Sequence, residues 1–317
     1  MEVKKFTKAA MLSAAFVAVS VFCIGIGLGY FGYIDFIVPA FTGIILLKCD
    51  LTYTILSCVV SLIIIIFIIG NIPSGIMMFQ SMILGIILAL FMKMRGNIFD
   101  DLFFSSIVSC IIMIFVDINF STLTGYSFLK ESINYINILP TTYDQYKDTI
   151  LYMSISCLPL GTVICGYILM AVAVKKLKIE QNNVIKKSIV LCEFKRYGQF
   201  LSCTKKSICI GMLLILITIF MNTYILTDKQ SYISILINSI EYIAIFFVFQ
   251  DSLGIINKSI YALTKSRGKL FLYQAVLLYC LVKFFYITFL VMIILNFYFD
   301  CKYNLKINFK KTLNDLI

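Results

Sequence analysis

The segment LTYTILSCVVSLIIIIFII, residues 51–69, decides the fold of this chain. It carries no charged side chain, and its length matches the roughly 20 largely apolar residues that a helix needs to cross a bilayer. Lys48 and Asp50 precede it, and Asn71 and Pro73 follow it. The segment therefore predicts a membrane-spanning helix with polar residues at both ends.

Similar apolar runs recur along all 317 residues, at 9–28, 36–47, 51–69, 75–92, 102–116, 150–174, 207–226, 231–253 and 270–299. The run at 36–47 contains Pro39 and is too short to cross a core about 30 Å thick. We expect it to be a short span or a re-entrant element packed inside protein. The pattern predicts an all-α, polytopic helical membrane protein with about nine transmembrane segments.

The composition excludes several classes of protein. Hydrophobic residues make up 61% of the chain and charged residues 14%, which rules out a soluble globular domain. His is absent, so a Ser-His-Asp triad and a His-ligated metal are excluded. No two of the 11 Cys are spaced as C-x-x-C, and most lie in apolar runs, where Cys acts as a small hydrophobe. We expect no catalytic centre, no metal and no cofactor.

Basic residues define the predicted domains and orientation. Residues 175–206 are polar and carry nine Lys or Arg, so we interpret them as a basic cytoplasmic loop. This loop separates a six-helix membrane domain, residues 1–174, from a three-helix unit with a short tail, residues 207–317. With the N-terminus inside, the inner ends collect 19 basic residues and the outer loops three, as the positive-inside rule requires. Nine crossings would leave the four lysines of the tail outside, as an exception.

Small residues form a stripe on the first predicted helix. Ala10, Ala14 and Ala18 recur at four-residue intervals and therefore share one face. Such stripes allow two membrane helices to approach closely. The partner is either another helix of this chain or a separate protein.

Glu241 and Lys283 are the two charges near the middle of long apolar runs. An ionisable group at that depth is costly unless it is paired or hydrated. Their predicted depths differ by roughly 5 Å at a helical rise of about 1.5 Å per residue. We interpret them as an ion pair between adjacent helices, with a proton or cation relay as the alternative.

Polar and aromatic residues gather at the predicted outer side. A cavity with aromatic walls and a few polar groups is what small-ligand pockets use. Alternatively, polar residues simply collect at helix ends. In the outer loop, Leu129, Ile133 and Ile136 recur at helical spacing and predict a short surface helix. The candidate pocket residues are Tyr30, Tyr33, Asp35, Asn71, Gln80, Asp117 and Asn119.

The loop at 175–206 mixes apolar with basic residues, among them Val184, Ile189 and Phe194. This mixture is typical of a helix that lies on anionic lipid. The basic residues do not form an aromatic-interleaved patch, so nucleic acid is not an expected partner.

Several short motifs resemble the YybS-like family of bacterial membrane proteins, a domain of unknown function (number 2232). They are KFTKAA at 5–10, the Ile-Val-Pro element ending at Pro39, the loop at 71–74, DSLGIINKSIYALTKSRGK at 251–269 and NFYFDCK at 296–302. The last is similar to the family's D-x-W-F-D-F-R-K end, with Asn296, Tyr298, Cys301 and Lys302 as departures.

The first half, to about Val174, also resembles the S component of energy-coupling-factor vitamin transporters, a six-helix membrane protein. In that family an A-x-x-x-A pattern on the first helix docks the coupling subunit, and Ala10, Ala14 and Ala18 occupy the matching positions. The resemblance implies a docking site for a membrane coupling subunit on this stripe.

The sequence favours a multi-pass protein of the bacterial cytoplasmic membrane that binds or translocates a small solute. It has no G-x-x-x-x-G-K-[ST] motif and hence no sign of an ATPase of its own. The alternative is a membrane scaffold or regulatory protein that recruits partners through the basic loop. A polar-lined cavity of a few hundred Å³ would favour the first function, and a filled helix bundle the second.

Overall fold

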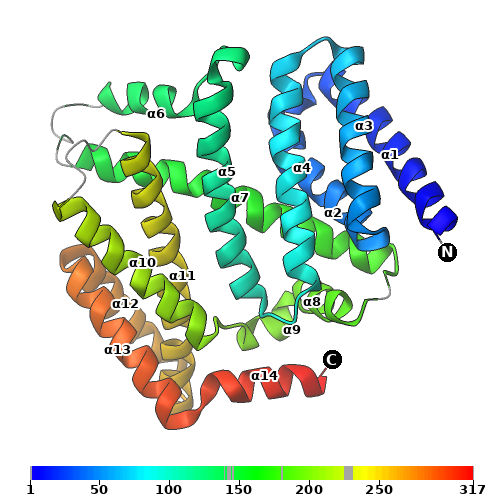
Figure 1. Cartoon of the computed structure of the whole chain (residues 1–317). Helices are drawn as coiled ribbons and strands as arrows, with labels where there is room; N and C mark the ends of the chain where they lie inside the picture. Colours follow the sequence, from blue (N-terminus) through cyan, green and yellow to red (C-terminus); the bar gives the residue numbers. More distant parts are fainter. Residues whose placement is uncertain are drawn as a thin grey trace.

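The computed structural model describes residues 2–138, 140, 144, 146–179, 181–224 and 231–316. Its helices are α1 (Glu2–Gly25), η1 (Leu28–Phe31), η2 (Tyr33–Ile37), α2 (Val38–Lys48), α3 (Leu51–Ile69), α4 (Ile72–Lys93), α5 (Ile98–Thr124), α6 (Phe128–Asn137), α7 (Lys147–Lys176), α8 (Asn182–Cys192), α9 (Phe194–Tyr197), η4 (Gly198–Phe200), α10 (Lys205–Tyr224), α11 (Tyr232–Thr264), α12 (Arg267–Lys283), α13 (Phe285–Tyr303) and α14 (Leu305–Leu316). The described ranges contain no strand (Figure 1).

Eight of the described helices are long and apolar enough to cross a membrane: α1, α3, α4, α5, α7, α10, α11 and α13. The predicted all-α polytopic fold is confirmed. The helices form a bundle with two distinct ends (Figure 1). We call the end that carries α8, α9 and α14 the basic end, and the opposite end, which carries α6, the α6 end.

Hydroxyl groups fix α1 against its neighbours. The Oγ atoms of Ser13 and Ser61 lie 2.6 Å apart and join α1 to α3. The Oγ atom of Ser20 lies 2.7 Å from the hydroxyl of Tyr33 in η2. Because these groups satisfy one another, α1 can bury its serines in an apolar environment without leaving them unpaired.

The short apolar run at 36–47 is enclosed by protein. It forms the end of η2 and most of α2, which packs against α4 and α7. Val38, Ile45 and Leu46 are each at most 2% exposed. A Cβ atom at Gly85 of α4 would collide with the carbonyl oxygen of Pro39, so glycine is what allows this close approach. The short element is therefore a core component of the bundle.

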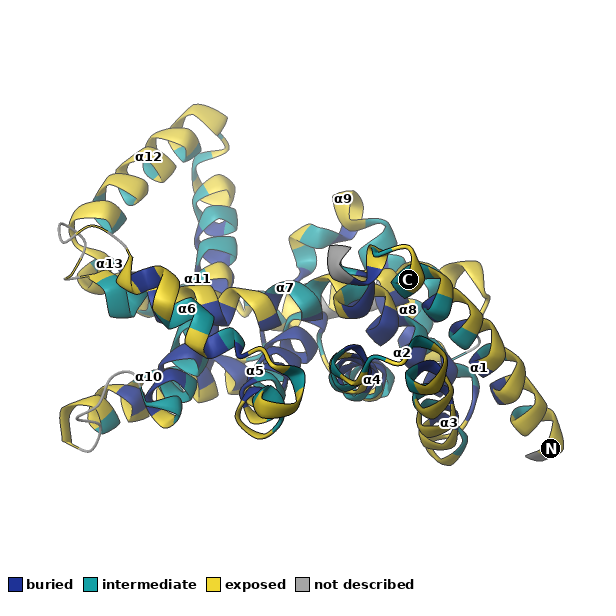
Figure 2. Ribbon diagram, turned by 90° about the horizontal axis from the view of Figure 1, so that it is seen from above, coloured by how far each residue is buried: buried dark blue, intermediate teal, exposed yellow. Residues whose placement is uncertain are grey.

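The predicted segments 1–174, 175–206 and 207–317 share one hydrophobic core. Phe103 of α5 meets Phe247 of α11 with 5.5 Å between ring centroids. Tyr167 of α7, Val184 of α8 and Ile243 of α11 are fully buried in the same cluster. Figure 2 shows this buried centre, with α1, α3 and α12 more exposed around it. The second half of the chain therefore packs directly on the first.

The basic loop folds onto the bundle as α8, α9 and η4. Val184 and Tyr197 are buried, and Ile189 packs against the main core. Phe194 is an exception, at 57% exposure. Most of the apolar residues that predicted a lipid-bound helix thus contact the chain itself.

The last apolar run, predicted as one span over 270–299, is two helices. The backbone leaves the helical conformation at Phe284, where α12 ends and α13 begins. The two helices form a V that is visible in Figure 2. This break turns the chain back, so the expectation of a single final crossing is corrected.

The C-terminal tail consequently lies at the basic end. The rings of Phe309 in α14 and Phe200 in η4 are 6.2 Å apart, and Lys306 forms an ion pair with Asp251 of α11 at 2.9 Å. Figure 1 shows α14 at the same end as α8 and α9. The tail lysines therefore join the other basic residues, and the predicted exception to the positive-inside rule disappears.

Candidate functional site

A cavity of about 220 Å³ lies between α4, α5 and α7, toward the α6 end. The N-terminal half of α4, the C-terminal half of α5 and the middle of α7 form most of its wall. The lining residues are Asp35, Ile76, Met77, Gln80, Ser81, Leu84, Ser109, Ile112, Met113, Val116, Asp117, Ser121, Thr124, Tyr126, Phe128, Leu158, Pro159 and Thr162.

Two serine side chains of this wall are available to a ligand. Ser81 of α4 is 6% exposed and Ser109 of α5 is 5% exposed. Neither side chain forms a hydrogen bond with a described residue. Both serines line the cavity, so a polar molecule bound there would find two hydroxyl groups that can donate or accept a hydrogen bond.

Asp117 fixes the rim of the cavity. Its two carboxylate oxygens accept hydrogen bonds from the Ser127 hydroxyl at 2.8 Å and from the Phe128 backbone N–H at 2.7 Å. The Ser127 hydroxyl in turn accepts from the Lys130 backbone N–H at the start of α6. The carboxylate of α5 thus holds the beginning of α6, and with it the aromatic ring of Phe128, against the cavity.

Pro159 shapes the wall that α7 contributes. It lies inside the helix and has no N–H, so the carbonyl of Ile155 lacks its helical donor. The hydroxyl of Thr162 donates to the Pro159 carbonyl at 3.1 Å. The middle of α7 therefore has more backbone polarity than an unbroken helix would show at that depth.

The charge of the cavity selects among ligands. Asp35 and Asp117 are carboxylates, and no Lys or Arg occurs among the described lining residues. A buried anion would meet two negative groups without a compensating cation, which is unfavourable at low dielectric. The lining suits a small uncharged or cationic molecule.

Three of the seven predicted pocket residues line the cavity: Asp35, Gln80 and Asp117. Tyr33 lies elsewhere, buried in a smaller hydrophobic cluster to which α1, α2, α3 and α4 contribute. The side chain of Tyr30 lies outside the part of the chain that is described.

The other two predicted pocket residues have local roles. Asn71 caps α4 by accepting a hydrogen bond from the Ser74 backbone N–H. Asn119 donates to the Phe115 carbonyl of its own helix at 2.7 Å. For these two, the alternative that polar residues collect at helix ends describes the structure better.

Sequence reasoning missed the two serines that matter most. Ser81 and Ser109 lie inside apolar runs, where a serine is equally compatible with close helix packing. Their common feature is that each faces a cavity whose walls come from distant parts of the sequence. No local pattern carries that information.

The alanine stripe is open. Ala10, Ala14 and Ala18 are exposed and line a groove of about 620 Å³ between α1 and α3. The adjacent small residues Ala9 and Ser13 are buried against the chain itself. The face that carries the stripe therefore has no packing partner within the described part of the chain.

Glu241 and Lys283 are not brought together. Lys283 is exposed at the end of α12, and its ammonium lies 5.2 Å from the Tyr279 ring centroid. Glu241 is half-buried within α11, and among the described residues no ion pair joins it to Lys283. The predicted depth of Lys283 assumed one continuous helix, whereas the break at Phe284 places it at the turn of the V.

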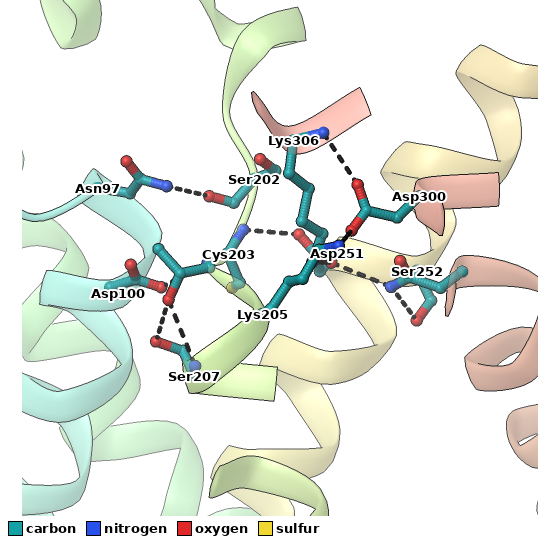
Figure 3. A network of polar contacts seen from close by, with 12 residues as sticks. Asn97, Asp100, Ser202, Cys203, Lys205, Ser207, Asp251, Ser252, Asp300 and Lys306 are labelled. Atoms are coloured by element: carbon teal, nitrogen blue, oxygen red, sulfur yellow. Dashed lines mark hydrogen bonds and ion pairs between the residues drawn. The ribbon is translucent and has the colours of Figure 1, made fainter. Parts of the chain in front are cut away.

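A polar network at the basic end joins the two halves (Figure 3). Asp251 accepts hydrogen bonds from the Cys203 backbone N–H at 2.6 Å and from the Asn296 side chain at 3.0 Å, in addition to its ion pair with Lys306. Burial raises the pKa of the Cys203 thiol well above its usual value, so this Cys is unreactive.

Asp100 of α5 holds Thr204, the residue that follows Cys203 in the segment before α10. Its carboxylate accepts the Thr204 backbone N–H at 2.9 Å, while Asn97 donates to the Ser202 carbonyl at 3.2 Å. The extended stretch before α10 is thus held by groups from both halves. The polar groups of these hydrogen bonds have their partners within the chain, which indicates that the network has a structural role. Among the described residues no cluster of Cys, Asp and Glu could hold a metal ion.

Comparison with known proteins gives one match. Residues 15–151 are similar to a family described as a predicted membrane protein (DUF2232), a stretch that covers less than half of the chain. It includes α4 and α5, which supply most of the cavity wall, and excludes the 251–269 and 296–302 segments. No curated protein and no solved structure matches the chain. With its apolar helices, this match supports an integral, multi-pass membrane protein.

Proposed function

We propose that the chain binds a small uncharged or cationic solute in the cavity between α4, α5 and α7. The observation that carries the proposal is the pair of buried serines, Ser81 and Ser109, that face this cavity without a partner among the described residues. Ser105 and Ser239 are also buried without a hydrogen-bond partner, but they are not among the described lining residues, so access to the cavity is what distinguishes Ser81 and Ser109. A volume of about 220 Å³ suits a molecule smaller than most drug-like ligands.

In this proposal the protein works as an S component does, with the solute taken from the α6 end. The basic end faces the cytoplasm of a bacterial cell, since it carries most of the Lys and Arg. The chain has no catalytic role here. Energy for translocation would come from a separate membrane coupling subunit.

The open alanine groove supports the coupling subunit as a partner. Ala10, Ala14 and Ala18 leave space for a helix backbone, and α3 supplies the opposite wall through Leu56 and Val60. A helix of the coupling subunit would occupy this groove within the membrane.

The alternative, a scaffold that recruits partners through the basic loop, has weaker support. Val184 and Tyr197 of that loop are buried in the fold, and Lys187 is used in internal contacts. These residues are therefore not free to contact a partner.

Thermal unfolding in detergent with benzyl alcohol, benzylamine and benzoate tests the proposal, because the three probes differ mainly in charge. Benzyl alcohol or benzylamine should raise the unfolding midpoint of the wild type, and benzoate should not. Ser109→Phe fills the cavity and should abolish the rise. Ile111→Phe, at an exposed position of the same helix, should keep it. If the probes shift the unfolding midpoints of Ser109→Phe and Ile111→Phe equally, the proposal is contradicted.

A further inference from the structure

A second cavity, of about 300 Å³, lies at the basic end, on the far side of the bundle from the solute cavity. The turn between α4 and α5, helix α8, the segment before α10 and one residue of α14 surround it. Its lining residues are Met94, Arg95, Gly96, Asn97, Ile98, Asn183, Lys186, Lys187, Val190, Leu201, Ser202 and Leu313.

Lys187 forms part of the wall of this cavity, and its ammonium group already has three hydrogen-bond acceptors within the chain. Its ammonium donates to the Phe91 carbonyl at 3.0 Å, the Met94 carbonyl at 2.8 Å and the Asp101 carboxylate at 2.6 Å. An ammonium has three hydrogens, and these acceptors use all of them. Burial lowers the pKa of Lys187, and the nearby carboxylate of Asp101 opposes this effect. Lys187 therefore joins α8 to the C-terminal end of α4.

The other two cations of the cavity are unpaired. Arg95 and Lys186 are exposed, and neither forms an ion pair or hydrogen bond with a described residue. They come from separate elements, the α4–α5 turn and α8, which Lys187 holds together. No Asp or Glu occurs among the described lining residues. Two free positive charges are thus presented at one cavity without a neutralising partner.

The remaining wall combines the polar residues Asn97, Asn183 and Ser202 with an apolar part. Val190, Leu201 and Leu313 belong to the apolar part, and Val190 is 1% exposed. A ligand that suits this cavity needs an anionic group for the cations and an organic portion for the wall. Arg recognises phosphate through paired N–H groups, and Lys binds it as a point charge.

We propose that this cavity binds a phosphate ester, with the phosphate between Arg95 and Lys186 and the organic portion against Val190, Leu201 and Leu313. The ester is either the headgroup of an anionic phospholipid or a soluble phosphorylated compound. This site is independent of the solute cavity, whose acidic lining selects the opposite charge.

The test measures binding of two probes to the full-length protein in detergent. The first is phosphatidylglycerol in mixed micelles, with phosphatidylcholine as the reference lipid, followed by native mass spectrometry. The second is glycerol 3-phosphate, followed by calorimetric titration. Binding of phosphatidylglycerol alone identifies a lipid headgroup, and binding of glycerol 3-phosphate identifies a soluble ester. Binding of neither overturns the proposal.

A matched pair of variants separates this site from general electrostatic attraction. The Arg95→Gln/Lys186→Gln double variant should weaken binding by about tenfold or more, since hydrogen bonds to charged groups are lost. Lys195→Gln/Arg196→Gln removes the same charges from exposed positions of α9 outside the cavity and should bind as the wild type does. An equal loss in both double variants would overturn the proposal. Lys186→Gln alone, on the exposed face of α8, should give part of the loss with folding intact.

Discussion

The ammonium nitrogen of Lys187 lies 2.6 Å from a carboxylate oxygen of Asp101, and both side chains are almost completely buried. The same carboxylate oxygen accepts the hydroxyl of Tyr167 at 2.6 Å. This contact joins the basic loop, the start of α5 and the C-terminal half of α7 at one point. It explains how a loop rich in Lys becomes part of the folded bundle.

Lys187→Met should destabilise the protein strongly, because it leaves the Asp101 carboxylate buried without its cation. Removing one partner of a buried pair typically costs about 3–5 kcal/mol. Lys186→Met, at the exposed neighbouring position, is the control and should change stability little. The measurement is the unfolding midpoint in detergent.

The combined Lys187→Met/Asp101→Asn variant should recover part of that loss. Asn is uncharged and still offers an oxygen to the Tyr167 hydroxyl, so no charge remains buried alone. The single variant Asp101→Asn is measured as well. If Asp101→Asn destabilises the Lys187→Met variant as much as it destabilises the wild type, the two residues do not act as a pair.

The position of the tail predicts that α6 and α14 lie on opposite sides of the membrane. Cys placed at Tyr135, which is 70% exposed on α6, should react with an impermeant thiol reagent on intact cells. Cys placed at Thr312 on α14 should react only after the cells are opened. Labelling of the native cysteines is measured in the protein without an introduced Cys and is subtracted. Equal labelling of both positions on intact cells would refute this topology.

The open alanine stripe predicts that Ala14→Leu leaves the protein folded but prevents docking of a coupling subunit. Ala14 is exposed, so the larger side chain extends into the groove. Ala9→Leu is the contrasting variant, because Ala9 is 2% exposed and an added side chain there should cost about 1–3 kcal/mol. The readouts are the yield of folded protein and co-purification of the coupling subunit. Loss of folded protein with Ala14→Leu would indicate that the stripe packs against another helix of this chain.

The positions of the long helices could be predicted from apolar runs and their polar boundaries. The short helix α6 was also predictable, since Leu129 and Ile136 repeat at helical spacing and are buried. The break at Phe284 was not. No Pro or Gly marks it within 270–299, and the aromatic residues around it are as compatible with a continuous span as with a turn.

The candidate site was predictable only in part, for a physical reason. Asp35, Gln80 and Asp117 are unusual in an apolar chain and could be recognised as polar groups near one end of the bundle. Whether such a residue faces a cavity depends on packing between helices that are distant in sequence. Asp117 lines the cavity, whereas Asn119, two residues later, is exposed on another face of the same helix.

The central claim, that the cavity of Ser81 and Ser109 holds a small solute, is tested most directly by identifying what the protein retains. Purified wild-type protein is incubated with a small-molecule extract of the cells that produce it, isolated again and analysed by mass spectrometry. Ser109→Phe and Ser81→Leu fill the cavity, and Ile111→Phe is the control; all must elute as folded protein. We predict an uncharged or cationic compound enriched with wild type and control and lost from both filled variants. The same small molecules on all four proteins would contradict the account.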